Sequence, residues 1–154
     1  MGQVVKFIVG SHAFFSKIEG FTSKDIDYVM MMDETPRGKK YEHVMVENRD
    51  YFIYRTMTKM ELIDHFIHVG SAKRASIFLI PEVIKYFGVT MTDLDMLQNV
   101  FYHIDDKHMY LKMIYDYYRQ NNGFFLTSIQ FKNVYDDYKK KRIKPENTDD
   151  KNPQ

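Results

Sequence analysis

The spacing of hydrophobic and polar positions changes once along this chain, near Thr58. Before that point apolar residues come in short runs, at 4–9, 25–32, 42–47 and 50–56, which is typical of β-strands. After it they recur every three or four residues, which is typical of amphipathic helices. Strands therefore fill the first third of the chain and helices the rest. This order predicts an α+β fold whose strands form a small mixed β-sheet.

The strand region is divided by short polar stretches. The first run ends at Gly10-Ser11, and residues 12–18 have the composition of a short helix. The second run, Asp25 to Met32, is apolar on both faces in its later part, as a central strand would be. A polar loop at 33–41 follows. The last two runs flank Asn48-Arg49, which we expect to form the tight turn of a hairpin.

The helical region has recognisable boundaries. Gly70 follows the first helix as a C-cap would, and Pro81 divides residues 71–88 into two short helices. Later helices are expected to begin at these N-caps: Thr92, then Asp105 or Asp106, then Thr127 with Gln130 as a capping box. Residues 121–123, Asn-Asn-Gly, should end the helix before the last. We expect residues 1–70 to form the core of the site, residues 71–144 to pack on it, and residues 145–154 to be a disordered tail.

The composition favours a globular protein of the cytoplasm. The chain has 154 residues, 44% of them hydrophobic, which suffices for one core. It has no cysteine, so thiol catalysis and cysteine–zinc sites are excluded. The formal charge of +1 provides no strong field toward nucleic acid, and no apolar run approaches a membrane span. We expect a soluble protein that does not bind membranes.

Two carboxylates at the start of the second strand suggest a functional site. Residues two apart on a strand point to the same face, so Asp25 and Asp27 would lie about 7 Å apart there. Such a pair is costly unless a positive charge stands between the two groups. Mg²⁺, which favours a few carboxylates together with phosphate oxygens, is the natural candidate. The Gly10-Ser11 corner at the end of the preceding strand suits a phosphate, because glycine allows close approach of backbone amides.

This pattern resembles the nucleotidyltransferase superfamily that includes DNA polymerase β and the minimal nucleotidyltransferases. The matching residues are Val9-Gly10-Ser11, thirteen spacer residues, and Asp25-Ile26-Asp27 followed by apolar residues. The resemblance covers residues 4–32. It implies Mg²⁺-dependent transfer of a nucleoside monophosphate from an NTP to a hydroxyl acceptor, with release of pyrophosphate.

The resemblance also implies roles for particular residues. Asp25 and Asp27 would bind Mg²⁺, with two ions possible, and Gly10 and Ser11 would hold the triphosphate. The family carries a third carboxylate on a later strand, which binds metal or deprotonates the acceptor. In the family this residue is an aspartate between two apolar residues, and no clear triplet of that kind is present here. Asp50 and Glu47 are the candidates for both roles, and Asp50 is preferred because it begins a strand.

Basic residues of the helical region are candidates for binding phosphate. Lys73 and Arg74 follow Gly70, and Lys107 opens a later helix. Each also has a plain explanation as a solvated helix residue. The acceptor is open between a small molecule, RNA and a protein, and a homodimer or a partner protein would help to recognise it. Two alternatives remain: a degenerate family member that binds nucleotide or a partner without turnover, and an interaction module with no affinity for nucleotides.

Overall fold

The computed structural model describes residues 4–151, with side chains described as far as Lys141. It has an α+β fold, as predicted. The strands are β1 (Val4–Val9), β2 (Ile26–Met32), β3 (Tyr41–Val46) and β4 (Arg49–Arg55). The helices are α1 (Ser11–Phe15), α2 (Lys59–Val69), α3 (Ala72–Ala75), α4 (Pro81–Phe87), α5 (Met91–Met96), α6 (Gln98–Tyr102), α7 (Met109–Asn121) and α8 (Ser128–Lys151), with short 3-10 helices η1 (Ser76–Leu79) and η2 (Asp106–His108).

The four strands form one mixed sheet in the order β1-β2-β4-β3. β1 pairs with β2 and β3 with β4 in antiparallel fashion, whereas β2 and β4 run parallel. β2 is thus a central strand, as predicted from its apolar run. Because β1 runs opposite to β2 and β4, the end of β1 lies at the same edge of the sheet as the beginnings of β2 and β4.

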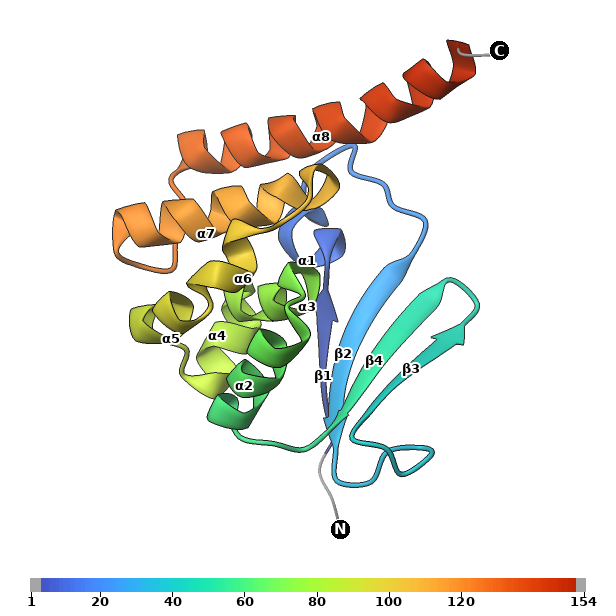
Figure 1. The fold of residues 1–154 in the computed structure, drawn as a ribbon. Coiled ribbons are helices and arrows are strands. Elements are labelled where there is room, and N and C mark those ends of the chain that lie inside the picture. The colour runs from blue at the N-terminus through green and yellow to red at the C-terminus, as the bar shows by residue number, and fades with distance from the viewer. Residues whose placement is uncertain (1–3, 152–154) are drawn as a thin grey trace.

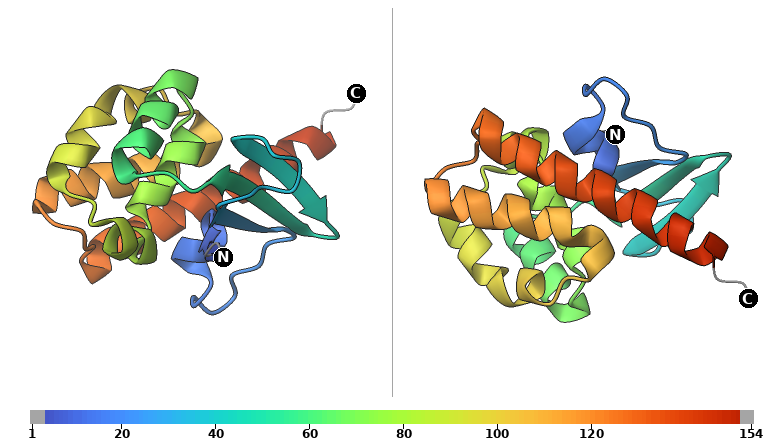
Figure 2. Two further views of the ribbon diagram at one scale, coloured as in Figure 1. Left: turned by 90° about the horizontal axis from the view of Figure 1, so that it is seen from below. Right: turned by 90° about the horizontal axis from the view of Figure 1, so that it is seen from above.

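The helices gather on one side of the sheet, and α8 passes over the edge where β1 ends (Figures 1 and 2). Alternate strand residues such as Val9, Val29 and Tyr54 face the helices and are buried. They join one continuous hydrophobic core with helix residues such as Phe66 and Phe101. The sheet part and the helical part therefore share a core.

The hairpin turns one residue earlier than predicted. Glu47 and Asn48 form the turn, and β4 already begins at Arg49. Glu47 adopts a φ of 56°, a left-handed conformation for which the sequence offers no glycine. Arg49 pairs with Ile26 of β2 and with Val46 of β3, so both neighbouring strands extend β4 to this residue. The second strand begins at Ile26, one residue after the predicted start at Asp25.

Two predicted helix starts were wrong. Thr90, and not Thr92, caps α5: its hydroxyl accepts a hydrogen bond from the Asp93 amide, and the Asp93 carboxylate accepts one from the Thr90 amide. A reciprocal cap is a stronger start signal than a single hydroxyl. Asp105 precedes the 3-10 helix η2, without a side-chain cap bond, and α7 begins only at Met109.

Other helix boundaries agree with the sequence. Gly70 ends α2 in the left-handed conformation, Pro81 begins α4, and Thr127 and Gln130 exchange the two hydrogen bonds of a capping box. The predicted disordered tail stays a prediction; in residues 145–151 the backbone continues α8. Residues 152–154 lie outside the described residues.

Candidate functional site

Carboxylates meet at the edge of the sheet where β1 ends and β2 and β4 begin. Asp27 and Asp50 are each the second residue of their strand and are partners in the parallel ladder. Register partners in a sheet point to the same face, and the two side chains are hydrogen-bonded to each other. The third aspartate, Asp25, lies just before β2, where its side chain is exposed.

Backbone contacts fix this arrangement. The Ile26 amide donates to the Asn48 carbonyl at 3.0 Å, and the Asn48 side-chain amide donates to the Lys24 carbonyl at 3.1 Å. The start of β2 is therefore tied to the β3–β4 turn, which brings Asp50 to Asp27. Glu47 occupies the turn itself, is exposed and does not line the cavity described below.

Gly10 lies close against the Asp27 side chain. A Cβ atom built on Gly10 would lie 3.2 Å from Oδ2 of Asp27. The residue also has a φ of 71° and a ψ of −157°, a conformation almost restricted to glycine. Helix α1 begins at the next residue, Ser11. The structure thus places Gly10 beside Asp27, whereas Asp25, the other member of the predicted pair, lies before β2 and is exposed.

The surroundings of Asp27 disfavour its negative charge. Burial raises the pKa of the Asp27 carboxyl; the Lys73 ammonium partly opposes this effect, while the charges of Asp50 and Asp25, and the hydrogen bond that protonated Asp27 donates to Asp50, add to it. A carboxyl in this position gains from any cation that reaches it.

His43 contacts Asp50 from the next strand. Its Nε2 lies 2.8 Å from Oδ1 of Asp50, and its ring stacks on Phe52 with centroids 4.7 Å apart. Sequence reasoning missed this residue. Its only signal is the hairpin pairing, in which His43 lies diagonally across from Asp50 on the same face of the sheet.

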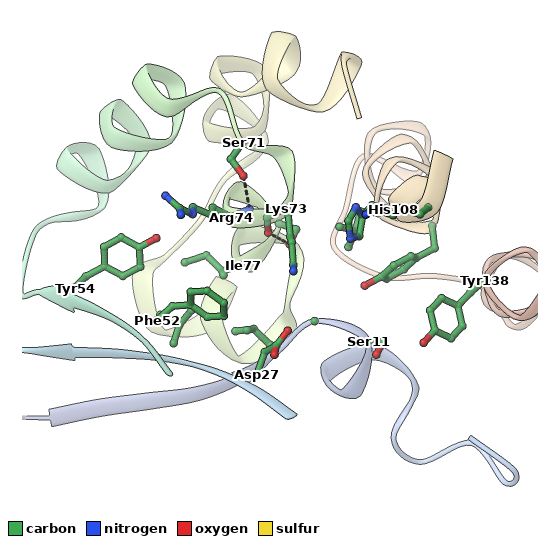
Figure 3. A pocket seen from close by; sticks show the side chains of 17 residues that line it. Ser11, Asp27, Phe52, Tyr54, Ser71, Lys73, Arg74, Ile77, His108 and Tyr138 are labelled. Carbon is green, nitrogen blue, oxygen red and sulfur yellow. Dashed lines mark hydrogen bonds between the residues drawn. The ribbon is translucent and has the colours of Figure 1, made fainter. Parts of the chain in front are cut away.

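A cavity of about 450 Å³ opens in front of Asp27 (Figure 3). It lies between the sheet edge and the helices α3, α7 and α8. Six of the predicted site residues line it: Gly10, Ser11, Asp27, Lys73, Arg74 and Lys107. Asp25, Asp50 and Glu47 are not among its lining residues. The cavity therefore unites Asp27 with the predicted phosphate-binding residues, while Asp50 lies outside the lining, next to Asp27 in the ladder.

The basic residues of α3 point in different directions. Ser71 caps this helix by accepting a hydrogen bond from the Arg74 amide. The Arg74 guanidinium lies over the Tyr41 ring, 4.5 Å from its centre, toward the sheet. Lys73 points into the cavity toward Asp27 (Figure 3). Lys73 is therefore the better placed of the two to meet a ligand in front of Asp27.

The helices add lining residues that the sequence did not single out for the site: His108, Tyr110 and Tyr138. Tyr110 is buried, and the burial raises the pKa of its phenol. The sequence gives no site signal at either tyrosine, because aromatic residues in an amphipathic helix are typical of a core. Their contact with a cavity depends on how α7 and α8 cross the sheet edge, which no local pattern encodes.

The aspartates at this edge of the sheet offer carboxylate oxygens as metal ligands. Among residues 4–141, whose side chains are described, no group of three or more His, Asp or Glu residues is arranged to hold a metal ion. Within residues 4–151, no helix has the length and apolar content to cross a membrane.

Neither a family model nor a curated protein nor a solved structure matches this chain.

Proposed function

We propose that this protein is a Mg²⁺-dependent nucleotidyltransferase, which moves a nucleoside monophosphate from an NTP to a hydroxyl acceptor and releases pyrophosphate. One observation carries the proposal. A single cavity is lined by Gly10, Ser11 and Asp27 on the sheet side and by Lys73 and Lys107 on the helix side. Carboxylates next to converging cations are the groups needed to bind a metal–triphosphate complex.

The residues at the sheet edge fit Mg²⁺. Asp27 and Asp50 are hydrogen-bonded to each other, and the neighbouring negative charges help to raise the pKa of Asp27. Carboxylate oxygens are hard ligands, and proteins usually bind Mg²⁺ through one or two of them plus phosphate oxygens and water. Asp27 and Asp50 would hold the ion, and the exposed Asp25 would have to move toward them to add a third carboxylate. The bound ion would supply charge neutralisation at the phosphates and activation of the acceptor hydroxyl.

The reaction needs few groups from the protein. The acceptor oxygen attacks the α-phosphorus of the NTP, the bond to the bridging oxygen breaks, and pyrophosphate leaves. Asp50, next to Asp27 in the ladder, accepts the proton of the acceptor hydroxyl, while His43 holds its carboxylate in place. Lys73 and Lys107 stabilise the negative charge that develops on the departing pyrophosphate.

The position of the cavity suggests where the acceptor binds. About 450 Å³ falls within the usual range for a small-ligand site, so one nucleotide would occupy the space between the sheet edge and the helices. The acceptor would then approach from outside the cavity, on the β4–β3 side, where Asp50 and His43 lie. Small-molecule, RNA and protein hydroxyls are all compatible with that open side, alone or with a second subunit or partner protein.

Calorimetric titration tests the proposal. ATP, GTP, CTP and UTP are titrated with and without Mg²⁺ into wild type, Asp27→Asn and a control, Asp33→Asn, which removes an exposed carboxylate just after the far end of β2. We expect Mg²⁺-dependent binding of at least one NTP in wild type and the control, and its loss in Asp27→Asn. Failure of every NTP to bind wild type would refute the proposal.

A second measurement follows the chemistry. The preferred NTP, labelled at its α-phosphate, is incubated with protein, Mg²⁺ and separated cellular RNA, protein and small-molecule fractions. We expect label to enter one fraction with wild type and with Asp33→Asn, but not with Asp27→Asn. Equal labelling by Asp27→Asn would contradict the assignment.

Binding without turnover is the second candidate function. It is favoured by the positions of Asp25 and Asp50, neither of which lines the cavity that Asp27 enters. In that case Mg²⁺-dependent binding would be lost in Asp27→Asn, yet no fraction would become labelled with wild type.

A further inference from the structure

His108 is a titratable group in the cavity wall for which the proposed reaction has no use. It is the last residue of η2 and directly precedes α7. Its ring lies across the cavity from Lys73 (Figure 3), and 24% of its side chain is exposed. Its Nδ1 is 4.0 Å from a carboxylate oxygen of Asp105, at the limit of an ion pair.

Cations dominate the surroundings of this imidazole. Lys73 and Lys107 line the same cavity, and neither forms an ion pair within 4.0 Å among the described residues. Burial, followed by the charge of Lys73 and more weakly that of Lys107, lowers the pKa of His108; Asp105 opposes the shift. In the free protein the ring is therefore neutral at neutral pH.

A polyanion in the cavity would reverse this balance. The groups that face His108 are Lys73 from α3, Asp105 just before η2, Lys107 from η2, and the phenols of Tyr110 and Tyr138 from α7 and α8, with Asp27 of β2 on the opposite wall. Phosphate oxygens would neutralise the two lysines and place negative charge next to the imidazole. Both effects favour its protonated form, which donates from both ring nitrogens.

We propose that His108 takes up a proton when a triphosphate occupies this cavity, and so becomes the third cation of a triphosphate subsite, with Lys73 and Lys107. The identity of the ligand as an NTP rests on the proposed function, whereas the subsite itself recognises a chain of phosphates. Triphosphate binding is then tighter on the acidic side of neutrality, and loss of the phosphates releases the proton again.

Inorganic tripolyphosphate is the probe, with the full chain and without Mg²⁺. Titration calorimetry near neutral pH in two buffers of different ionisation enthalpy gives the protons taken up per ligand bound. Wild type is compared with His108→Asn and with His103→Asn, a control for an exposed histidine outside the cavity. Protonation of the ligand itself is common to all three proteins and cancels in the comparison.

We expect wild type and His103→Asn to take up more protons than His108→Asn, by up to about one per site. Between about pH 6 and pH 8, the wild-type affinity should fall roughly tenfold more than that of His108→Asn. Equal proton uptake in wild type and His108→Asn overturns the proposal, and so does the failure of tripolyphosphate to bind wild type.

An NMR measurement avoids dependence on the folding of a variant. The Cε1–H resonance of His108 in wild-type protein should move toward its imidazolium position when tripolyphosphate is added near neutral pH. A resonance that stays at its neutral position in the saturated complex overturns the proposal.

The same samples separate this inference from the proposed function. Proton uptake by His108 without Mg²⁺-dependent NTP binding would support the phosphate subsite and refute the nucleotidyltransferase. Mg²⁺-dependent nucleotidyl transfer without proton uptake by His108 would refute only the subsite.

Discussion

Replacement of Gly10 by alanine tests the close approach of the Gly10 backbone to the Asp27 carboxylate. Two effects combine at this position. Its φ of 71° with ψ of −157° lies in a region almost restricted to glycine, and a non-glycine residue there costs about 1–3 kcal/mol. In addition, the new Cβ would lie 3.2 Å from Oδ2 of Asp27, closer than an ordinary van der Waals contact, so the carboxylate must move by a few tenths of an ångström.

The expected magnitudes follow from these effects. For a chain of this size each kcal/mol shifts the melting temperature by about 2–4 °C, so Gly10→Ala should melt about 2–12 °C below wild type. Displacement of Asp27 should also weaken Mg²⁺-dependent NTP binding, by roughly tenfold to a hundredfold. Thermal denaturation measures the first effect, and calorimetric titration measures the second in protein that is still folded.

Gly20→Ala is the matched control. Gly20 also has a left-handed φ, of 87°, but a Cβ atom there meets nothing within 4 Å. This variant should lose stability through backbone strain and keep its affinity for the Mg²⁺–NTP complex. The reasoning is refuted if Gly10→Ala binds the complex as wild type does, or if Gly20→Ala loses as much affinity.

Three further predictions concern stability. The pKa of Asp27 is raised above its ordinary value of 3.8, so the folded state binds the extra proton and loses stability as pH rises through the folded pKa. Asp27→Asn should therefore melt above wild type at neutral pH without Mg²⁺, with the gain absent below about pH 3; a lower melting temperature at neutral pH would contradict this. Phe15→Ala should cost about 3–5 kcal/mol in urea unfolding, because the fully buried ring of Phe15 packs against Tyr110 and Tyr138, and Phe15→Leu should cost less. Thr58→Ala should cost about 1 kcal/mol through loss of the capping box of α2, and Thr58→Ser should restore most of it; equal stability of all three proteins would argue against the cap.

Local features of the fold could be predicted from the sequence. The C-cap at Gly70, the helix start at Pro81 and the capping box of Thr127 each depend on residues a few positions apart, and all three are correct. The position of the hairpin turn was wrong by one residue, because Val46 pairs with Arg49 and leaves Glu47, without a glycine, in the left-handed conformation of the turn.

The site residues likewise divide into those that the sequence could predict and those that depend on long-range contacts. The approach of Gly10 to Asp27 follows from one strand ending beside the start of the next, so the sequence could predict it. Asp50 was predicted as a candidate because it begins a strand, but its place beside Asp27 follows from the pairing of β2 with β4. His43 and His108 could not be predicted, because the first depends on the hairpin register and the second on the place where η2 meets the cavity.

The ladder between β2 and β4 has a consequence for how this sequence can diverge. Asp27 and Asp50 are brought together by backbone pairing, so the loop between β2 and β3, at the opposite edge of the sheet, can change length without moving either carboxylate (Figure 1). A slip of one residue in β4 would instead turn Asp50 to the other face of the sheet. We therefore expect natural variants to vary freely in the length of residues 33–40 and to conserve the number of residues between the hairpin turn and Asp50.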